Sequence, residues 1–268
     1  MMMEDVQGRS DERGVEIKQV GVSDLSYPIV VLDRARERQN TIARLSMSVG
    51  LPHHFKGTHL SRFIEVLSAH RGEITMRTLP AILEELRRRL DAETARVSLT
   101  FPYFLERRAP VTGAAALMDY QCTFVGEASA TSADFLMGVT VPVTSLCPCS
   151  KEISEYGAHN QRSYITTEIR SASPVMDATT IVWIEELVEV AESASSCPVY
   201  PLLKRPDERH VTMQAYNNPK FVEDIVRDVA LRLRDDRRIG WFRACARSDE
   251  SIHNHSAFAE VEWKRTGS

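Results

Sequence analysis

Two thiols and an imidazole lie within one short stretch of this chain. Cys147 and Cys149 flank a single proline directly after an apolar segment, and His159 follows a Gly-Ala pair that permits a sharp turn. Cysteine and histidine are the usual ligands of zinc and similar metals. Because the Cys-x-x-Cys pairs of a closed structural zinc site are absent, the stretch favours a catalytic metal with three protein ligands and an open position for water. The alternative is a pair of buried, unreactive thiols beside a solvated histidine.

A second group of titratable side chains lies near the C-terminus. Glu250, His253 and His255 fall in a short connection between two expected strands. A carboxylate and two imidazoles in such a place can relay protons during a reaction. A plain polar turn is the alternative, but the chain has only 8 histidines and two of them are here, which favours a catalytic role.

Charged residues elsewhere suit a phosphorylated substrate. The segment 202–210 is dense in charge, and a solvated loop is the common explanation of such a run. In the functional interpretation its basic groups hold phosphate oxygens, and Glu208 offers a metal a hard oxygen ligand. A second basic set opens an expected helix, whose N-terminal amides add to an anion site. The candidate phosphate-binding residues are Lys204, Arg205, Lys56, His59 and Arg62.

Composition limits the class of protein. The 268 residues carry a formal net charge of -4, with 43% hydrophobic and 26% charged residues, as in ordinary globular proteins. This charge gives no general attraction to nucleic acid or to anionic membranes. No apolar run reaches membrane-spanning length, and the start of the chain lacks the pattern of a signal peptide. Five cysteines without a disulfide framework indicate a reducing, cytoplasmic location.

The hydrophobic periodicity predicts one plan used twice. Alternating apolar residues indicate strands, and apolar residues three or four apart indicate helices, in the order strand, strand, helix, helix, strand, strand. The expected fold class is α+β, with antiparallel sheets and helices on one face. Open sheet edges favour a homo-oligomer. The expected division is a disordered tail at 1–14, a first module at 15–128, and a second module at 129–268 that carries most of the metal site.

Four helices are expected in this plan. In the first module they cover residues 59–70 and a segment with Thr78 as its N-cap; in the second they cover 178–191 and 219–234. Asn218 is expected to cap the last helix, with a proline in its first turn. Glu223 then lies near the N-terminus of that helix, where an acid also favours the helix dipole.

The combined segments resemble the type IB GTP cyclohydrolases, a prokaryotic family of tunnelling-fold enzymes. The resemblance covers nearly the whole chain after its tail, through the segments 56–63, 100–104, 142–150, 157–163, 202–208, 218–230 and 250–257. It implies the tunnelling fold, with two tandem ββααββ modules in each subunit of a homotetramer. It also implies active sites completed between neighbouring subunits.

The resemblance assigns roles to the candidate residues. It implies Cys147, His159 and Glu208 as ligands of one divalent metal, which can be zinc, manganese or iron. Cys149 stays an alternative to Cys147. Glu223 is implied as the carboxylate that anchors the guanine edge of GTP. The catalytic set is then Cys147 with the three titratable groups near the C-terminus.

The implied reaction converts GTP and water to 7,8-dihydroneopterin triphosphate and formate, the first step of tetrahydrofolate-type pterin biosynthesis. Ring opening gives a formamide, a second hydrolysis releases formate, and the ribose rearranges before the pterin ring closes. Each of these steps moves protons. Two other classes stay open: a tunnelling-fold, NADPH-dependent nitrile reductase with a cysteine nucleophile, and a non-catalytic binding module stabilised by a metal.

Overall fold

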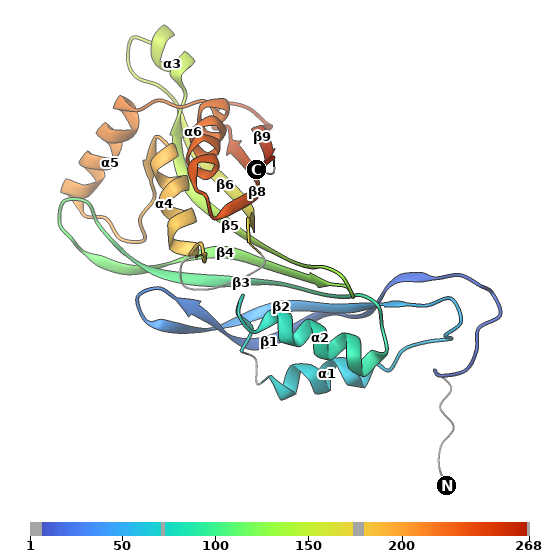
Figure 1. The fold of residues 1–268 in the computed structure, drawn as a ribbon. Coiled ribbons are helices and arrows are strands. Elements are labelled where there is room, and N and C mark those ends of the chain that lie inside the picture. Colours follow the sequence, from blue (N-terminus) through green and yellow to red (C-terminus); the bar gives the residue numbers. More distant parts are fainter. Residues whose placement is uncertain (1–6, 71–72, 174–179, 267–268) are drawn as a thin grey trace. The chain divides into compact units, whose positions relative to one another are not determined.

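The computed structural model describes residues 7–70, 73–173 and 180–266, drawn as a ribbon in Figure 1. The strands are β1 (Ile17–Asp33), β2 (Glu37–Leu51), β3 (Ala95–Arg108), β4 (Ala115–Ala128), β5 (Ala133–Leu146), β6 (Asn160–Ser171), β7 (Cys197–Pro198), β8 (Ile239–Asp249) and β9 (Ser256–Lys264). The helices are α1 (Leu60–Ala69), α2 (Leu79–Leu90), α3 (Pro148–Ile153), α4 (Ile184–Ala194), α5 (Arg205–Asn217) and α6 (Val222–Asp235). Within the described ranges, none of the helices has the length and apolar character needed to cross a membrane.

The described strands form one 9-stranded sheet. Their pairing order is β1-β2-β3-β4-β5-β6-β8-β9, and the short β7 pairs with β5. The pairs β1–β2, β2–β3, β6–β8 and β8–β9 are antiparallel. Helices and antiparallel strands together confirm the predicted α+β class. The strands β1 and β9 end the pairing order.

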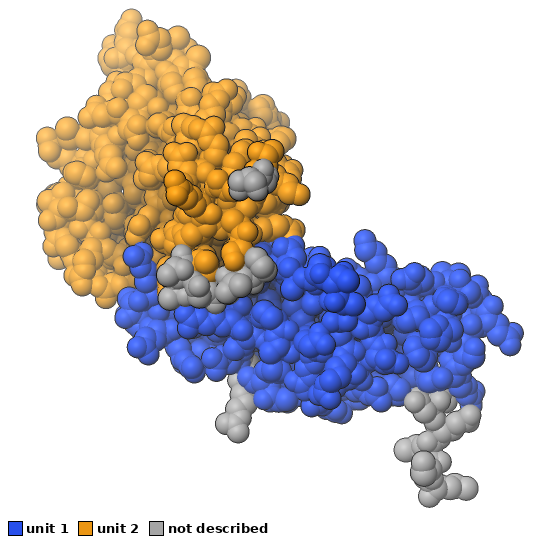
Figure 2. All heavy atoms as spheres, in the orientation of Figure 1, with its two compact units in different colours: residues 1–101, 123–136 blue, residues 102–122, 137–268 orange. Residues whose placement is uncertain are grey.

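The described chain forms two compact units, shown in blue and orange in Figure 2. The first unit contains Met1–Phe101 and Thr123–Leu136, and the second contains Pro102–Cys122 and Met137–Ser268. The boundaries fall inside β3, β4 and β5, so each of these strands gives residues to both units. The expected tail and the two tandem modules describe another division of the chain, by internal repetition, and stay a prediction.

The helices of the first unit lie where the sequence predicts them. The helix α1 falls inside the expected range 59–70, and Thr78 is the N-cap residue of α2. The apolar stripe of α2 is buried, as its spacing predicts. Its members are Leu79, Ile82, Leu83, Leu86 and Leu90.

The first described residues pair with a segment of the first unit. Ser10 forms an isolated antiparallel bridge with Phe55, and the amide of Asp11 donates to the carbonyl of His54 at 3.0 Å. The amide of Lys56 donates in return to the carbonyl of Arg9 at 3.1 Å. Residues 1–6 of the expected tail lie outside the described residues.

In the second unit the last helix begins later than expected. Phe221, not Asn218, is the N-cap of α6, and its amide donates to the carboxylate of Asp224 at 3.1 Å. The prediction of Asn218 as the cap is wrong. Asn218 is instead the C-cap of α5. Its side-chain amide donates to the carbonyls of Ser195 at 2.8 Å and Ser196 at 3.3 Å. That tertiary contact is invisible to a local capping rule.

The helix α4, expected at residues 178–191, also begins later than expected. Residues 178 and 179 of the range 178–191 lie outside the described residues, and α4 begins at Ile184. The amide of Trp183 donates to Glu186 at 2.8 Å and closes the first turn. This pattern, an acid three residues after the N-cap, satisfies an amide that the helix itself leaves unpaired.

The helix α5 occupies the segment that charge density alone assigns to a loop. Its first turn contains Asp207, whose side chain is fully buried. The carboxylate accepts from the amides of Lys204, Val111 and Thr112 at 3.0, 2.9 and 2.9 Å, and from the Thr112 hydroxyl at 2.7 Å. Burial by itself raises the pKa of Asp207, but these hydrogen bonds outweigh burial and hold the pKa well below its ordinary value. Asp207 thus fastens α5 to the turn between β3 and β4.

Candidate active site

Cys147 lies where β5 ends and the short helix α3 begins. It is the N-cap of α3, and Pro148 takes the first helical position, which its fixed φ favours. The Sγ atom of Cys147 accepts from the amide of Ser150 at 3.4 Å. Cys147 is half-buried, whereas Cys149 is exposed on α3. The helix therefore separates two thiols that an extended chain would place on one side.

His159 is held beside Cys147 by the backbone. The Cys147 amide donates to the His159 carbonyl at 3.1 Å, and the His159 amide donates to the hydroxyl of Ser150 at 3.3 Å. The imidazole Nδ1 lies 2.9 Å from Oε1 of Gln161 and 3.9 Å from Oε2 of Glu250. The structure thus brings together three of the predicted site residues: Cys147, His159 and Glu250.

A buried polar network supports this group. Gln161 donates from Nε2 to the Ser145 hydroxyl at 3.1 Å and to Glu250 Oε1 at 3.3 Å. The Ser163 hydroxyl lies 2.6 Å from those of Ser145 and Ser248. All three serines are at most 1% exposed. Gln161 and the three serines were not among the site residues predicted from the sequence. Polar residues at the buried positions of an alternating strand could have indicated them.

The predicted group of Glu250, His253 and His255 divides in the structure. The Glu250 carboxylate is only 14% exposed and points to the network just described. His253 and His255 are exposed in the turn between β8 and β9. Their rings stack, with centroids 5.0 Å apart and an interplanar angle of 17°. Two stacked, solvated imidazoles can exchange protons with a ligand that approaches from solvent.

The remaining residues of the second unit are exposed on two helices. Lys204 is the N-cap of α5, Arg205 and Glu208 lie in its first turn, and Glu223 lies in the first turn of α6. Within residues 7–70, 73–173 and 180–266, no three His, Cys, Asp or Glu side chains form a group that could hold a metal. The structure therefore brings Cys147 near His159 but does not add Glu208 to them.

The other basic set belongs to the first unit. Lys56 is exposed, and His59 is the N-cap of α1. The Arg62 guanidinium donates to the carbonyl of Arg89 at 2.9 Å, near the C-terminal end of α2. Arg62 thus has a structural contact between the two helices, whatever else it binds.

Comparison with known proteins decides the family. The family model for type I GTP cyclohydrolase folE2 matches residues 3–259. GTP cyclohydrolase FolE2 of Geobacter sulfurreducens is 55% identical over 260 residues, covering 97% of this chain and 98% of the relative. GTP cyclohydrolase FolE2 of Methylococcus capsulatus is 52% identical, covering 98% of this chain and 95% of the relative. That of Halorhodospira halophila is 50% identical, covering 99% of this chain and 100% of the relative.

The chain belongs to the type I GTP cyclohydrolase FolE2 family. This confirms the expectation of a GTP cyclohydrolase, a hydrolase that acts on a cyclic amidine. The matching family and its relatives carry the name FolE2, so the assignment to the type I GTP cyclohydrolases is confirmed, and the subdivision type IB stays a prediction.

Solved structures show the fold of this FolE2 family member. Uricase from Arthrobacter globiformis superposes with a TM-score of 0.55 at 12% identity, covering 93% of this chain and 94% of the uricase. Urate oxidase from Bacillus subtilis gives 0.54 at 8% identity, covering 92% and 98%. At such low identity the likeness concerns the fold alone, and it confirms the predicted tunnelling fold.

Cavities lie in both units of the FolE2 fold. The cavity of about 450 Å³ in the second unit is lined by Gly157, Ala158 and Asn160, which flank His159, and by Tyr200 and Tyr216. Cys197 also lines this cavity, and burial raises the pKa of its thiol to about 11. A thiol that stays protonated at neutral pH is a weak nucleophile.

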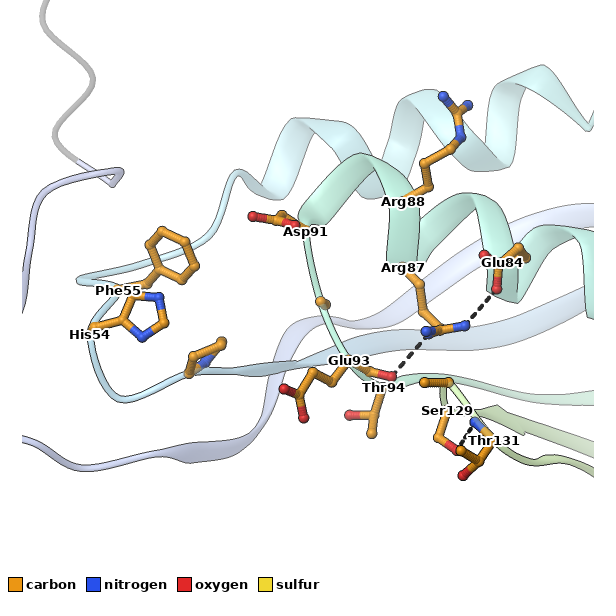
Figure 3. Close-up of a pocket in the computed structure, with 13 residues that line it drawn as sticks. His54, Phe55, Glu84, Arg87, Arg88, Asp91, Glu93, Thr94, Ser129 and Thr131 are labelled. Carbon is orange, nitrogen blue, oxygen red and sulfur yellow. Dashed lines mark hydrogen bonds and ion pairs between the residues drawn. The ribbon is translucent and has the colours of Figure 1, made fainter.

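A larger cavity lies in the first unit, and none of the predicted site residues lines it. It measures about 750 Å³ and adjoins the end of α2 (Figure 3). There the Arg87 side chain donates to the Glu93 carbonyl at 2.9 Å and pairs with Glu84 at 2.6 Å (Figure 3). The side chain of Arg87, which lines this cavity, is thus already bound to groups of the first unit.

Proposed function

We propose that this chain is a metal-dependent GTP cyclohydrolase of the subdivision called type IB. It converts GTP and water to 7,8-dihydroneopterin triphosphate and formate, the first step of tetrahydrofolate-type pterin biosynthesis. The observation that carries the proposal is the backbone hydrogen bond of 3.1 Å that holds Cys147 beside His159, in a chain whose relatives are named GTP cyclohydrolase FolE2. The cavity lined by residues on both sides of His159 supports a substrate site at this place.

The donor chemistry of Cys147 and His159 fits a divalent metal. A half-buried thiol and a half-buried imidazole suit zinc, manganese or iron. Glu208 is the proposed third ligand, on the resemblance alone, because its carboxylate is exposed on α5 and is not gathered with the other two. When bound, the metal supplies a water whose pKa is lowered towards neutrality.

The chain's own residues bind and orient GTP in this proposal. The exposed carboxylate of Glu223 accepts hydrogen bonds from the ring N–H and the exocyclic amine of guanine. Lys204 and Arg205 stand at the N-terminus of α5, where charge and backbone amides both favour phosphate oxygens. Lys56, His59 and Arg62 are proposed to bind the triphosphate in a site that neighbouring subunits complete.

Proton transfer is assigned to the group near the C-terminus. Glu250 is held by Gln161 and is positioned to accept a proton close to His159. His253 and His255 are exposed and stacked, so they can pass protons between substrate and solvent. Cys147 completes the proposed catalytic set.

A homotetramer with sites at subunit interfaces is proposed for the assembly. None of the residues of the end strand β9 is buried, and Phe258 on it is 73% exposed. An end strand with unpaired backbone groups is a template for another chain. The five free cysteines support a reducing cytoplasm as the place of action.

The test is turnover of GTP by the purified protein, with chelator and with added zinc or manganese. Formate release and fluorescence of the oxidised pterin are followed together. The proposal expects metal-dependent formation of both products. Loss of NADPH absorbance with a deazaguanine nitrile, and no formate from GTP, would instead identify a nitrile reductase. Unfolding on chelation without any turnover would identify a metal-stabilised binding module.

A further inference from the structure

Gln161 lies at the centre of the buried network and contacts two proposed site residues. It is 8% exposed on the inner face of β6. In the antiparallel pair β6–β8, Ser163 is opposite Ser248. Continuing that register by two residues places Gln161 opposite Glu250, on the same face. The position of Gln161 between His159 and Glu250 therefore follows from strand register.

The orientation of the Gln161 amide is fixed by its neighbours. The Glu250 carboxylate accepts hydrogen bonds and donates none when ionised, so the group that faces it at 3.3 Å is the amide NH₂. The second N–H of that NH₂ donates to the Ser145 hydroxyl at 3.1 Å. The remaining atom, Oε1, can only accept, and it lies 2.9 Å from Nδ1 of His159. Nδ1 must therefore carry the proton.

We propose that Gln161 is a positioning residue that holds neutral His159 as its Nδ1–H tautomer and aligns Glu250 beside it. The lone pair of the imidazole is then on Nε2, the nitrogen available to a metal. A metal-bound histidine commonly donates its other ring N–H to an oxygen acceptor, which fixes the tautomer and the ring orientation. A carboxamide oxygen takes that place here. The inference rests on the proposed metal role of His159.

Three buried serines extend the network beyond Gln161. The buried hydroxyl of Ser163 is hydrogen-bonded to those of Ser145 and Ser248. Ser145 also accepts a hydrogen bond from one N–H of Gln161. Buried polar groups are costly unless all are paired. A network that is paired in only one arrangement of the Gln161 amide opposes rotation of that amide.

The first test reads the tautomer of His159 directly. Histidine-labelled, metal-free protein is studied by ring ¹⁵N–¹H correlation at a pH above the ordinary histidine pKa of about 6.5. The His159→Gln variant identifies the signal by its loss. The inference expects the Nδ1–H form in the unaltered protein, and loss of its dominance in Gln161→Leu. Gln161→Asn, which keeps a buried amide but withdraws it by one methylene, is expected to act like Gln161→Leu.

Two variants serve as controls for the tautomer. Ser145→Ala removes one partner of Gln161 but leaves the bond to His159, so the Nδ1–H form is expected to persist. Gln121→Leu makes the same chemical change at an exposed position of β4 and is expected to change nothing. An Nε2–H form in the unaltered protein, or an Nδ1–H form that stays dominant in Gln161→Leu and Gln161→Asn, would overturn the inference.

The second test measures zinc affinity by competition with a chromophoric chelator. Loss of a residue that orients a metal ligand commonly weakens binding about 10- to 100-fold, and that loss is expected for Gln161→Leu but not for Gln121→Leu. Equal zinc affinities in these two variants would count against Gln161. The tautomer assay does not depend on turnover. A protein that shows the expected tautomers but releases no formate from GTP would retain this inference and lose the proposed function.

Discussion

Arg107 on β3 and Glu192 on α4 form an ion pair inside the second unit, where the Glu192 side chain is only 7% exposed. The hydroxyl of Tyr120 donates to the same carboxylate at 3.2 Å. Burial raises the pKa of Glu192, while the charge of Arg107 and the two hydrogen bonds oppose that rise. The guanidinium therefore balances a charge that α4 carries into the core.

Replacement of Arg107 by methionine is expected to destabilise the protein in a pH-dependent way. Removing one partner of a buried pair commonly costs about 3–5 kcal/mol of unfolding free energy. Without Arg107 the pKa of Glu192 rises further above its unfolded value of about 4.3. Stability is then fully present below that unfolded value and is lost as the pH rises through the folded pKa. Urea unfolding at about pH 5 and about pH 8 should show the larger deficit at the higher pH.

The adjacent Arg108 provides the control for that experiment. Its side chain is 68% exposed and pairs with Glu106 on the same strand. Arg108→Met is expected to change the unfolding free energy by about 0.5 kcal/mol or less. Equal deficits of Arg107→Met at the two pH values would contradict the assigned role of Arg107.

The two thiols of the Cys-Pro-Cys segment are expected to respond differently to replacement. Cys147→Ser should lower zinc affinity at least about 100-fold, because loss of a supporting contact alone already costs about 10- to 100-fold. Cys149 is exposed on α3, so Cys149→Ser should bind zinc and turn over GTP like the unaltered protein. Metal content after dialysis and formate release measure both variants. The opposite ranking would make Cys149 the ligand.

Local pattern was sufficient for much of the fold. The stripe of α2 and its N-cap Thr78 follow from spacing and residue type, and both are where the sequence places them. Alternation likewise predicted most strands, because one face of each is buried. The helix α5 was missed, since its buried anchor Asp207 binds the distant residues Val111 and Thr112. A charged segment gives no sign of such a contact.

The candidate site was predictable in its residue types but not in its geometry. The spacing of Cys147 and His159 indicated a common site, and the structure brings them together. The link from His159 to Glu250 through Gln161 depends on the register of β6 and β8, which are far apart in sequence. A strand pattern states which face is buried and not which residue on another strand lies opposite.

Gly126 on β4 is expected to tolerate no side chain. A Cβ there would lie 2.5 Å from Cδ2 of Leu79 and 3.0 Å from Cδ1 of Leu83. Leu79 is 1% exposed and Leu83 is 3% exposed, so neither has open space to move into. Gly126→Ala should therefore lose about 1–3 kcal/mol of unfolding free energy, the usual cost of overpacking. Thermal and urea unfolding measure the loss.

A second substitution tests the cause of that loss. Gly57→Ala is the control, because its added Cβ would meet only side-chain and backbone atoms of Gln7 at ordinary distances of 3.5 Å and above. In the double variant Gly126→Ala with Leu79→Ala, the smaller residue relieves the clash. The unfolding free energies lost in the single variants Gly126→Ala and Leu79→Ala should then sum to more than the loss measured in the double variant. If the two losses simply add, the clash with Leu79 is not the cause of the loss in Gly126→Ala.

Asp236, after the end of α6, is expected to stabilise the protein at neutral pH and not in acid. Burial raises the pKa of Asp236, but hydrogen bonds from Arg238 outweigh burial and lower it. The Arg238 guanidinium donates to both carboxylate oxygens, at 3.0 and 2.6 Å. An acid with a lowered folded pKa contributes stability above its unfolded pKa of about 3.9, and that stability is lost as the pH falls through the folded value.

Asp236→Asn should accordingly lower stability by about 0.5–1 kcal/mol near pH 7, a modest value because solvent screens this partly exposed pair. The difference from the unaltered protein should shrink in acid, below about pH 3.9, as the pH falls through the lowered folded pKa of the native carboxyl. The neighbouring Asp235 is 79% exposed, so Asp235→Asn is the matched control and should leave stability unchanged at both pH values. A constant deficit of Asp236→Asn across this range would mean that the side chain acts through its shape and not through its charge.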